Sequence, residues 1–160
     1  MFGPREYANA LPPLLGQASA YARALLRNRH DAEDAVQQAA LRALERIATF
    51  DSNHSFRGWW FAILRNCCID LARTRKRRPT EPLGAHLADN QATNEAKWLQ
   101  LDRAIERLST QHQEILRLRY FGELSYADLA ETLQIPPGTV MSRLHLARKA
   151  LSTLLSEDEL

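Results

Sequence analysis

Long apolar runs are missing from this chain of 160 residues. Its apolar stretches last only a few positions, whereas a helix that crosses a bilayer needs roughly 20 apolar residues. The opening residues, MFGPREYANALPPLLG, also lack the basic start and long apolar core of a secretory signal. We therefore expect no membrane insertion and a cytoplasmic protein.

Cysteine is scarce, because the chain holds only the adjacent pair Cys67 and Cys68. One adjacent pair builds neither a disulfide framework nor a zinc site made of cysteines. The sequence also lacks a phosphate-binding glycine loop, an HExxH metal motif, and a Ser or Cys set beside a plausible base. We predict that the protein is not an enzyme and has no catalytic residues, no metal and no cofactor.

Strand signals are few, and apolar residues recur three and four positions apart, which is the period of amphipathic helices. With 45% hydrophobic residues the chain can still bury a core. We predict an all-α fold in which Asp31 caps the second helix. The inward stripe expected on that helix is Ala35, Val36, Ala39, Ala40, Ala43, Leu44 and Ile47. The expected helices cover about residues 7–27, 31–47, 56–78, 94–108, 110–122 and 126–133, followed by a last helix after Pro137.

The composition changes at Pro79. The stretch PTEPLGAHLADNQATNE has two prolines, a glycine and many small polar residues, but no sustained apolar stripe. Such a stretch is typical of a linker. The sequence therefore predicts two small helical domains, residues 1–78 and 95–160, joined by a flexible linker over residues 79–94.

Positive charge is concentrated in one segment. Residues 65–78 contain six basic residues and one acid, a balance of +5, so the rest of the chain carries +2 − 5 = −3. Cations also favour helix C-termini, but the run RTRKRR has five cations in six residues, more than capping needs. The segment indicates a surface that meets nucleic-acid phosphates.

The stretch YADLAETLQIPPGTVMSRLHLARKAL, residues 126–151, has the pattern of a helix-turn-helix. Ser125 and Asp128 resemble a capping box for its first helix. Leu129, Ala130 and Leu133 are expected to face inward. On the second helix the inward residues are Val140, Leu144 and Ala147, and the residues left to touch bases or phosphates are Thr139, Ser142, Arg143, His145, Arg148 and Lys149.

Three residues reduce the DNA affinity expected from this stretch. Gln134 stands at the turn, where glycine is common because the backbone often adopts a positive φ. Met141 and Leu146 are apolar where a stronger DNA binder would carry cations. A helical hairpin of a protein–protein module and a stand-alone helix-turn-helix regulator are the alternative interpretations, but neither needs the basic segment of the first half.

Three segments together resemble the sigma-70 family, and in particular its extracytoplasmic-function (ECF) subfamily. DAEDAVQQAALRALERIATFD resembles the helix that grips the clamp helices of RNA polymerase. SFRGWWFAILRNCCIDLARTRKRR resembles the segment that melts and reads the minus-ten element. LSTQHQEILRLRYFGELSYADLAETLQIPPGTVMSRLHLARKAL resembles the domain that reads the minus-thirty-five element. The resemblance covers about residues 14–78 and 101–154.

The resemblance implies a sigma-2-like helical bundle followed by a sigma-4-like helix-turn-helix domain. On the first segment, an exposed leucine among amides and carboxylates suits a partner surface, although a lone surface leucine needs no explanation. The expected polymerase-binding residues are Asp34, Gln37, Gln38, Leu41 and Glu45.

Trp59, Trp60 and Phe61 are consecutive, so they cannot all point into one core. The family pattern favours Trp59 as the core residue. The loop FDSNHS resembles the family's pocket for a base flipped from the non-template strand, and the basic residues would hold phosphates. The expected minus-ten residues are Asp51, Ser52, Asn53, His54, Phe56, Arg65, Asn66, Arg73, Arg75, Lys76, Arg77 and Arg78.

A transcription initiation factor is the function that this resemblance implies. Its expected partners are bacterial core RNA polymerase, promoter DNA both as duplex and as melted non-template strand, and an anti-sigma factor. Two weak DNA readers on one polymerase would raise each other's effective concentration.

Overall fold

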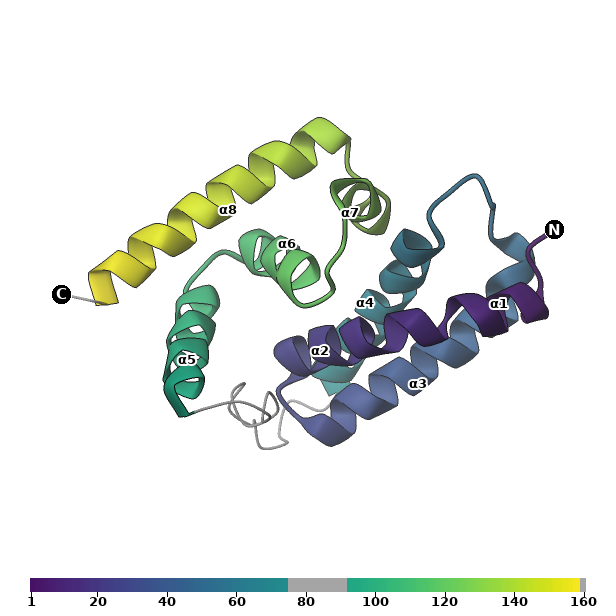
Figure 1. Cartoon of the computed structure of the whole chain (residues 1–160), viewed down its shortest axis with the longest axis horizontal. Coiled ribbons are helices and arrows are strands. Elements are labelled where there is room, and N and C mark those ends of the chain that lie inside the picture. Colours follow the sequence, from purple (N-terminus) through teal and green to yellow (C-terminus); the bar gives the residue numbers. More distant parts are fainter. Residues whose placement is uncertain (75–91, 159–160) are drawn as a thin grey trace.

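The computed structural model describes residues 1–74 and 92–158, and within these ranges the chain is helical with no β-strand (Figure 1). The all-α prediction is confirmed. None of the helices in these ranges is both long and apolar enough to cross a membrane. The first group of helices is α1 (Pro4–Ala10), a 3-10 turn η1 (Pro12–Leu14), α2 (Leu15–Leu26), α3 (Arg29–Arg46), a second turn η2 (Ile47–Thr49) and α4 (Phe56–Thr74).

The second group is α5 (Ala92–Glu106), α6 (Thr110–Tyr120), α7 (Tyr126–Leu133) and α8 (Pro137–Asp158). In Figure 1 the two groups lie side by side, and α7 approaches α4. The predicted minus-ten residues Arg75, Lys76, Arg77 and Arg78, and most of the predicted linker, fall outside the described residues. The predicted domain boundaries therefore stay a prediction.

The prolines Pro12 and Pro13 divide the expected first helix into α1 and α2 through η1, since proline removes a backbone donor inside a helix. The start of α3 also differs from the prediction. Asn28, rather than Asp31, is its N-cap, and the Asn28 side chain accepts a hydrogen bond from the Asp31 amide at 3.0 Å. Asp31 is buried in the first turn, where the helix dipole stabilises a carboxylate.

The prediction that Trp59 is the core residue is wrong. Trp60 is fully buried, whereas Trp59 is only partly buried. The Trp59 ring packs at 5.0 Å from Phe50 and 5.8 Å from Phe56, measured between ring centroids. This aromatic cluster closes the end of the helical bundle that carries the loop between α3 and α4.

The helix-turn-helix forms as the sequence predicts. Ser125 accepts a hydrogen bond from the Asp128 amide while the Asp128 carboxylate accepts one from the Ser125 amide, so the capping box is complete. Gln134 has φ of 53°, in the left-handed region. On α8 the predicted inward residues are all buried: Val140, Leu144 and Ala147.

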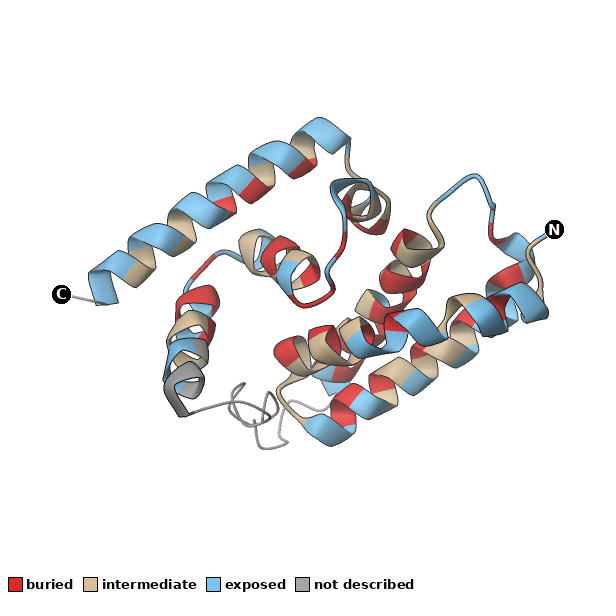
Figure 2. Cartoon of the chain, in the orientation of Figure 1, coloured by how far each residue is buried: buried red, intermediate tan, exposed pale blue. Residues whose placement is uncertain are grey.

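One continuous hydrophobic core joins the two groups of helices (Figure 2). Tyr21 and Phe61 of the first group meet edge to face, with ring centroids 6.0 Å apart. Leu116 and Leu118 of α6 belong to the same core and are fully buried. The sequence left open whether the two parts pack against each other, and in this structure they do.

Candidate nucleic-acid interface

One face of α3 stays open to solvent, and the predicted polymerase-binding residues lie on it. Gln37, Leu41 and Glu45 are exposed, while Asp34 and Gln38 are partly buried. The Leu41 side chain is 63% exposed, although a buried leucine would stabilise the fold more. An open apolar side chain among amides and carboxylates suits the predicted partner surface.

Leu44 corrects the expected inward stripe of α3. The sequence places Leu44 in this stripe, but its side chain is 42% exposed. The small residues Ala35, Ala39 and Ala43 are the ones fully buried on that helix. Leu44 therefore adds a second apolar side chain to the open part of α3.

The loop between α3 and α4 carries most of the predicted base pocket. Asp51, Ser52, Asn53 and His54 are exposed. Phe56 instead joins the aromatic cluster, with its ring 5.3 Å from Phe2 and stacked on it. The structure thus brings four of the five loop-side candidates to the surface and packs the fifth.

Helix α7 lies directly against this loop. The Ser55 amide donates to Glu131 Oε2 at 2.8 Å, and the Ser55 hydroxyl donates to Asp128 Oδ1 at 2.5 Å. His54 Nδ1 lies 3.5 Å from Glu131 Oε1. Thr132 Oγ1 donates to the Gly58 carbonyl at 2.9 Å, and both residues are buried. The loop of the predicted base pocket is therefore covered on one side by the first helix of the helix-turn-helix.

Two arginines make ion pairs that connect the same two parts of the chain. Arg65, a predicted phosphate contact, binds Glu114 of α6. Arg27 binds Asp102 and, at 2.8 Å, Glu106 of α5. Burial raises the pKa of Asp102 even though Arg27 opposes this, and burial together with Arg27 lowers the pKa of Arg117.

A basic groove of about 440 Å³ lies between α3 and α4. Asn66 and Arg73, both predicted minus-ten residues, line it and are exposed. Arg42 and Arg46 of α3 line it too, and Arg42 NH1 lies 3.4 Å from Asp70 Oδ2. Sequence reasoning missed these two arginines, because it took basic runs as its signal and they are isolated in the sequence.

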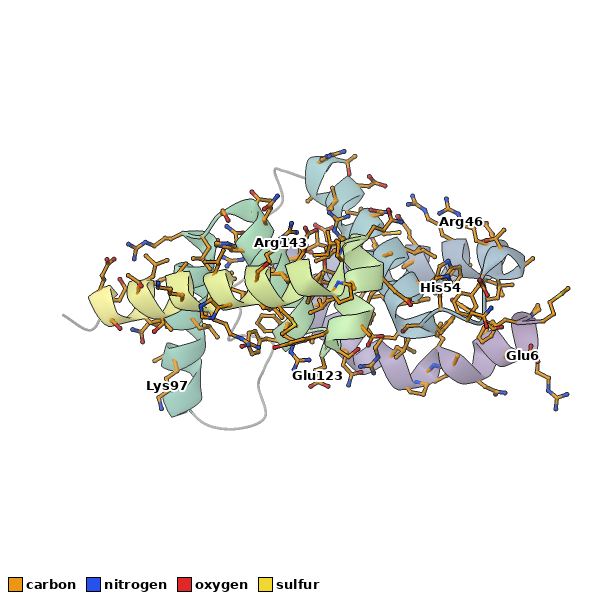
Figure 3. The ribbon with its side chains drawn as sticks, turned by 90° about the horizontal axis from the view of Figure 1, so that it is seen from above. Glu6, Arg46, His54, Lys97, Glu123 and Arg143 are labelled. Atoms are coloured by element: carbon orange, nitrogen blue, oxygen red, sulfur yellow. The ribbon has the colours of Figure 1, made fainter. Side chains whose placement is uncertain are left out.

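The outward residues of α8 form the second candidate surface. In Figure 3, Arg143 on α8 lies away from Arg46 and His54, which belong to the N-terminal half of the chain. Ser142, His145 and Lys149 are exposed, and Thr139 and Arg143 are partly buried at the edge of this surface.

Two tyrosines hold Arg148 beside this surface. Arg148 Nε donates to Tyr120 OH at 2.8 Å and its NH1 donates to Tyr126 OH at 3.4 Å. These two hydrogen bonds, led by that to Tyr126, raise the pKa of Arg148. The sequence predicted Arg148 as a DNA contact but gave no signal for its two partners, which come from different helices.

The two cysteines lie next to each other on α4. Both are buried, and burial raises the pKa of each thiol, which favours the neutral thiol over the reactive thiolate. The described part of the chain groups no three His, Cys, Asp or Glu side chains that could hold a metal ion.

Two family models match the chain. The model described as sigma-70 region 2 matches residues 13–78, and that described as sigma-70 region 4 matches residues 98–151. The first match holds the open face of α3 and the loop. The second holds the helix-turn-helix.

Known proteins resemble most of the chain. The ECF RNA polymerase sigma factor SigW of Bacillus subtilis is 34% identical over 151 residues, covering 83% of this chain and 80% of that protein. The ECF sigma factor SigL of Mycobacterium tuberculosis is 34% identical over 147 residues, covering 86% and 81%.

Two solved structures share the fold. CnrH in complex with the cytosolic domain of CnrY aligns with a TM-score of 0.74 and 25% identity, covering 96% of this chain and 90% of that chain. RpoE of Bartonella quintana in complex with the anti-sigma factor NepR aligns with a TM-score of 0.73 and 25% identity, covering 95% and 98%. On these matches, the chain belongs to the ECF sigma factors of the sigma-70 family.

Proposed function

We propose that this protein is a transcription initiation factor, which binds core RNA polymerase in the cytoplasm and directs it to promoters without catalysing a reaction itself. One observation carries the proposal: a chain that matches both sigma-70 regions presents an open apolar and amide-rich face on α3 and a complete helix-turn-helix. Polymerase supplies the catalysis, and this chain supplies the promoter sequence preference.

The α3 face is the proposed polymerase site, with Leu41 at its centre. The loop after α3 is the proposed pocket for a base flipped out of the non-template strand, and flipping costs a few kcal/mol. Phosphate contacts offset that cost. Of the described candidates, Asn66 and Arg73 already line the groove between α3 and α4. The outward residues of α8 are the proposed readers of the minus-thirty-five element.

The packed arrangement of the two parts does not suit promoter binding. Arg65 is engaged by Glu114, and the loop residues His54 and Ser55 are engaged by α7. A strand entering the loop and a phosphate approaching Arg65 would both compete with these contacts. We therefore propose that the two parts separate when polymerase and promoter DNA bind.

An inhibitory protein is a further proposed partner. The two solved structures of similar fold each hold a second protein, CnrY in one and the anti-sigma factor NepR in the other. A protein that binds both parts of this chain at once would keep the loop closed against α7. It would thereby oppose promoter binding.

Run-off transcription tests the proposal. Purified bacterial core polymerase is combined with this protein and a fragmented genomic library from its source, and new start sites are mapped. Discrete starts that depend on the protein are the expected result, and they give the promoter consensus. A footprint on duplex DNA without polymerase, together with no new starts, would instead favour a stand-alone helix-turn-helix regulator.

A further inference from the structure

Two large apolar side chains stand in the open on α8. Met141 is 60% exposed and Leu146 is 54% exposed. Between them in the sequence, Leu144 is buried against the rest of the core. Leu144 belongs to the inward stripe of the helix, and these two apolar residues lie outside that stripe.

Helix geometry places both residues at the proposed DNA surface. At about 100° per residue, Ser142, His145, Leu146 and Lys149 fall within one arc of roughly 100°. Met141 lies roughly 40° beyond His145 on the same side. This arc faces away from the buried stripe, and its members are exposed. It is the part of a recognition helix that enters the major groove.

The same arc holds few groups that could read guanine. Guanine is most often read by Arg or Lys. Arg143 lies partly buried at one border of the arc, and Arg148 at the other border is held by two tyrosines. Lys149 is the one permanently charged residue within the arc.

Apolar side chains do have a partner in the major groove, because thymine presents a C5-methyl group there. We propose that Met141 and Leu146 contact thymine methyl groups in the minus-thirty-five element, so that this protein selects thymine at the positions they face. The inference rests on the proposed function, since α8 must enter the groove of promoter DNA. It adds specificity-determining residues to that function.

Replacing thymine by deoxyuridine removes only the methyl group and so tests this contact. In a promoter found by run-off transcription, each thymine of the minus-thirty-five element is replaced singly, and binding of the holoenzyme is measured. We expect affinity to fall about fourfold at each contacted thymine, the ratio that corresponds to about 0.8 kcal/mol for one buried carbon group. In Leu146→Ala, deoxyuridine should no longer lower the affinity at the thymine that Leu146 contacts. In Met141→Ala, the same should hold at a different thymine.

Lys149→Ala is the matched control, because it lies on the same arc but carries no apolar contact. This variant should bind all fragments more weakly and keep the full effect of deoxyuridine. The proposal is overturned if deoxyuridine changes nothing with the wild-type protein, or if its effect persists in both apolar variants. In that second case the two side chains would serve a protein partner instead. If the holoenzyme starts transcription at no discrete site, the proposed function is overturned as well.

Discussion

Gln134 ends α7 with φ of 53° and ψ of 50°, a left-handed conformation that costs a side chain roughly 1–2 kcal/mol. Glycine avoids this cost but loses more chain entropy on folding. We expect Gln134→Gly to raise the free energy of unfolding by about 0.5–1 kcal/mol, measured by urea denaturation. Gln134→Ala keeps a Cβ and should bring no gain. A loss of stability in Gln134→Gly would show that the glutamine side chain supports the turn.

Burial of single residues was the least predictable property. The sequence shows that Trp59, Trp60 and Phe61 cannot all enter one core, but it does not say which one stays outside. The choice depends on the rotation of α4 against its neighbours, which buries Trp60 and Phe61 fully and Trp59 only in part. The same limit applies to Leu44. Its spacing places it in the apolar stripe, but it is exposed because the neighbouring helices cover a narrower part of α3 than the stripe occupies.

The exposed face of α3 yields a prediction for a whole element. Leu41→Asp places a charge at a site that is already 63% exposed, so the fold should keep its stability while polymerase binding is lost. Copurification with core polymerase and thermal unfolding measure the two effects.

Leu15→Asp on α2 is the matched control, since Leu15 is an exposed leucine on another helix. It should leave polymerase binding intact. A Leu41→Asp variant that still assembles holoenzyme would remove α3 from the interface.

Helix ends were predicted well where the signal is local. The capping box of Ser125 and Asp128 joins residues three apart, and the structure contains it. Asn28 was missed as the cap of α3, because Asp31 three residues later is an equally good cap by type. The backbone conformation before the helix decides between two such residues, and the sequence does not display it.

For the whole molecule, Gly58 is a point at which α4 and α7 pack closely against each other. A Cβ there would lie 3.0 Å from Glu131 Cβ and 3.2 Å from the Asp128 carbonyl oxygen. We expect Gly58→Ala to force α7 away from α4 and to lower the free energy of unfolding by about 1–3 kcal/mol. Thermal unfolding measures the loss, and faster hydrogen exchange in α7 locates it.

Gly16→Ala serves as the control, because a Cβ at this position on α2 would have no atom within 4 Å apart from its chain neighbours and the adjacent backbone of its own helix. It should stabilise the chain by roughly 0.5–1 kcal/mol, the usual gain from replacing glycine in a helix. Unchanged stability and exchange in Gly58→Ala would contradict the close packing of the two parts.

The sequence by itself determined the helices, the helix-turn-helix and the family, because these depend on apolar period, capping residues and motifs within short segments. Only the tertiary structure decided that α7 closes the loop of His54 and that Arg65 pairs with Glu114. These residues are distant in the sequence, and no local propensity brings them together. Packing of both parts on one core brings them together, which is why the contacts that cover the proposed promoter-binding surfaces could not be predicted from the sequence.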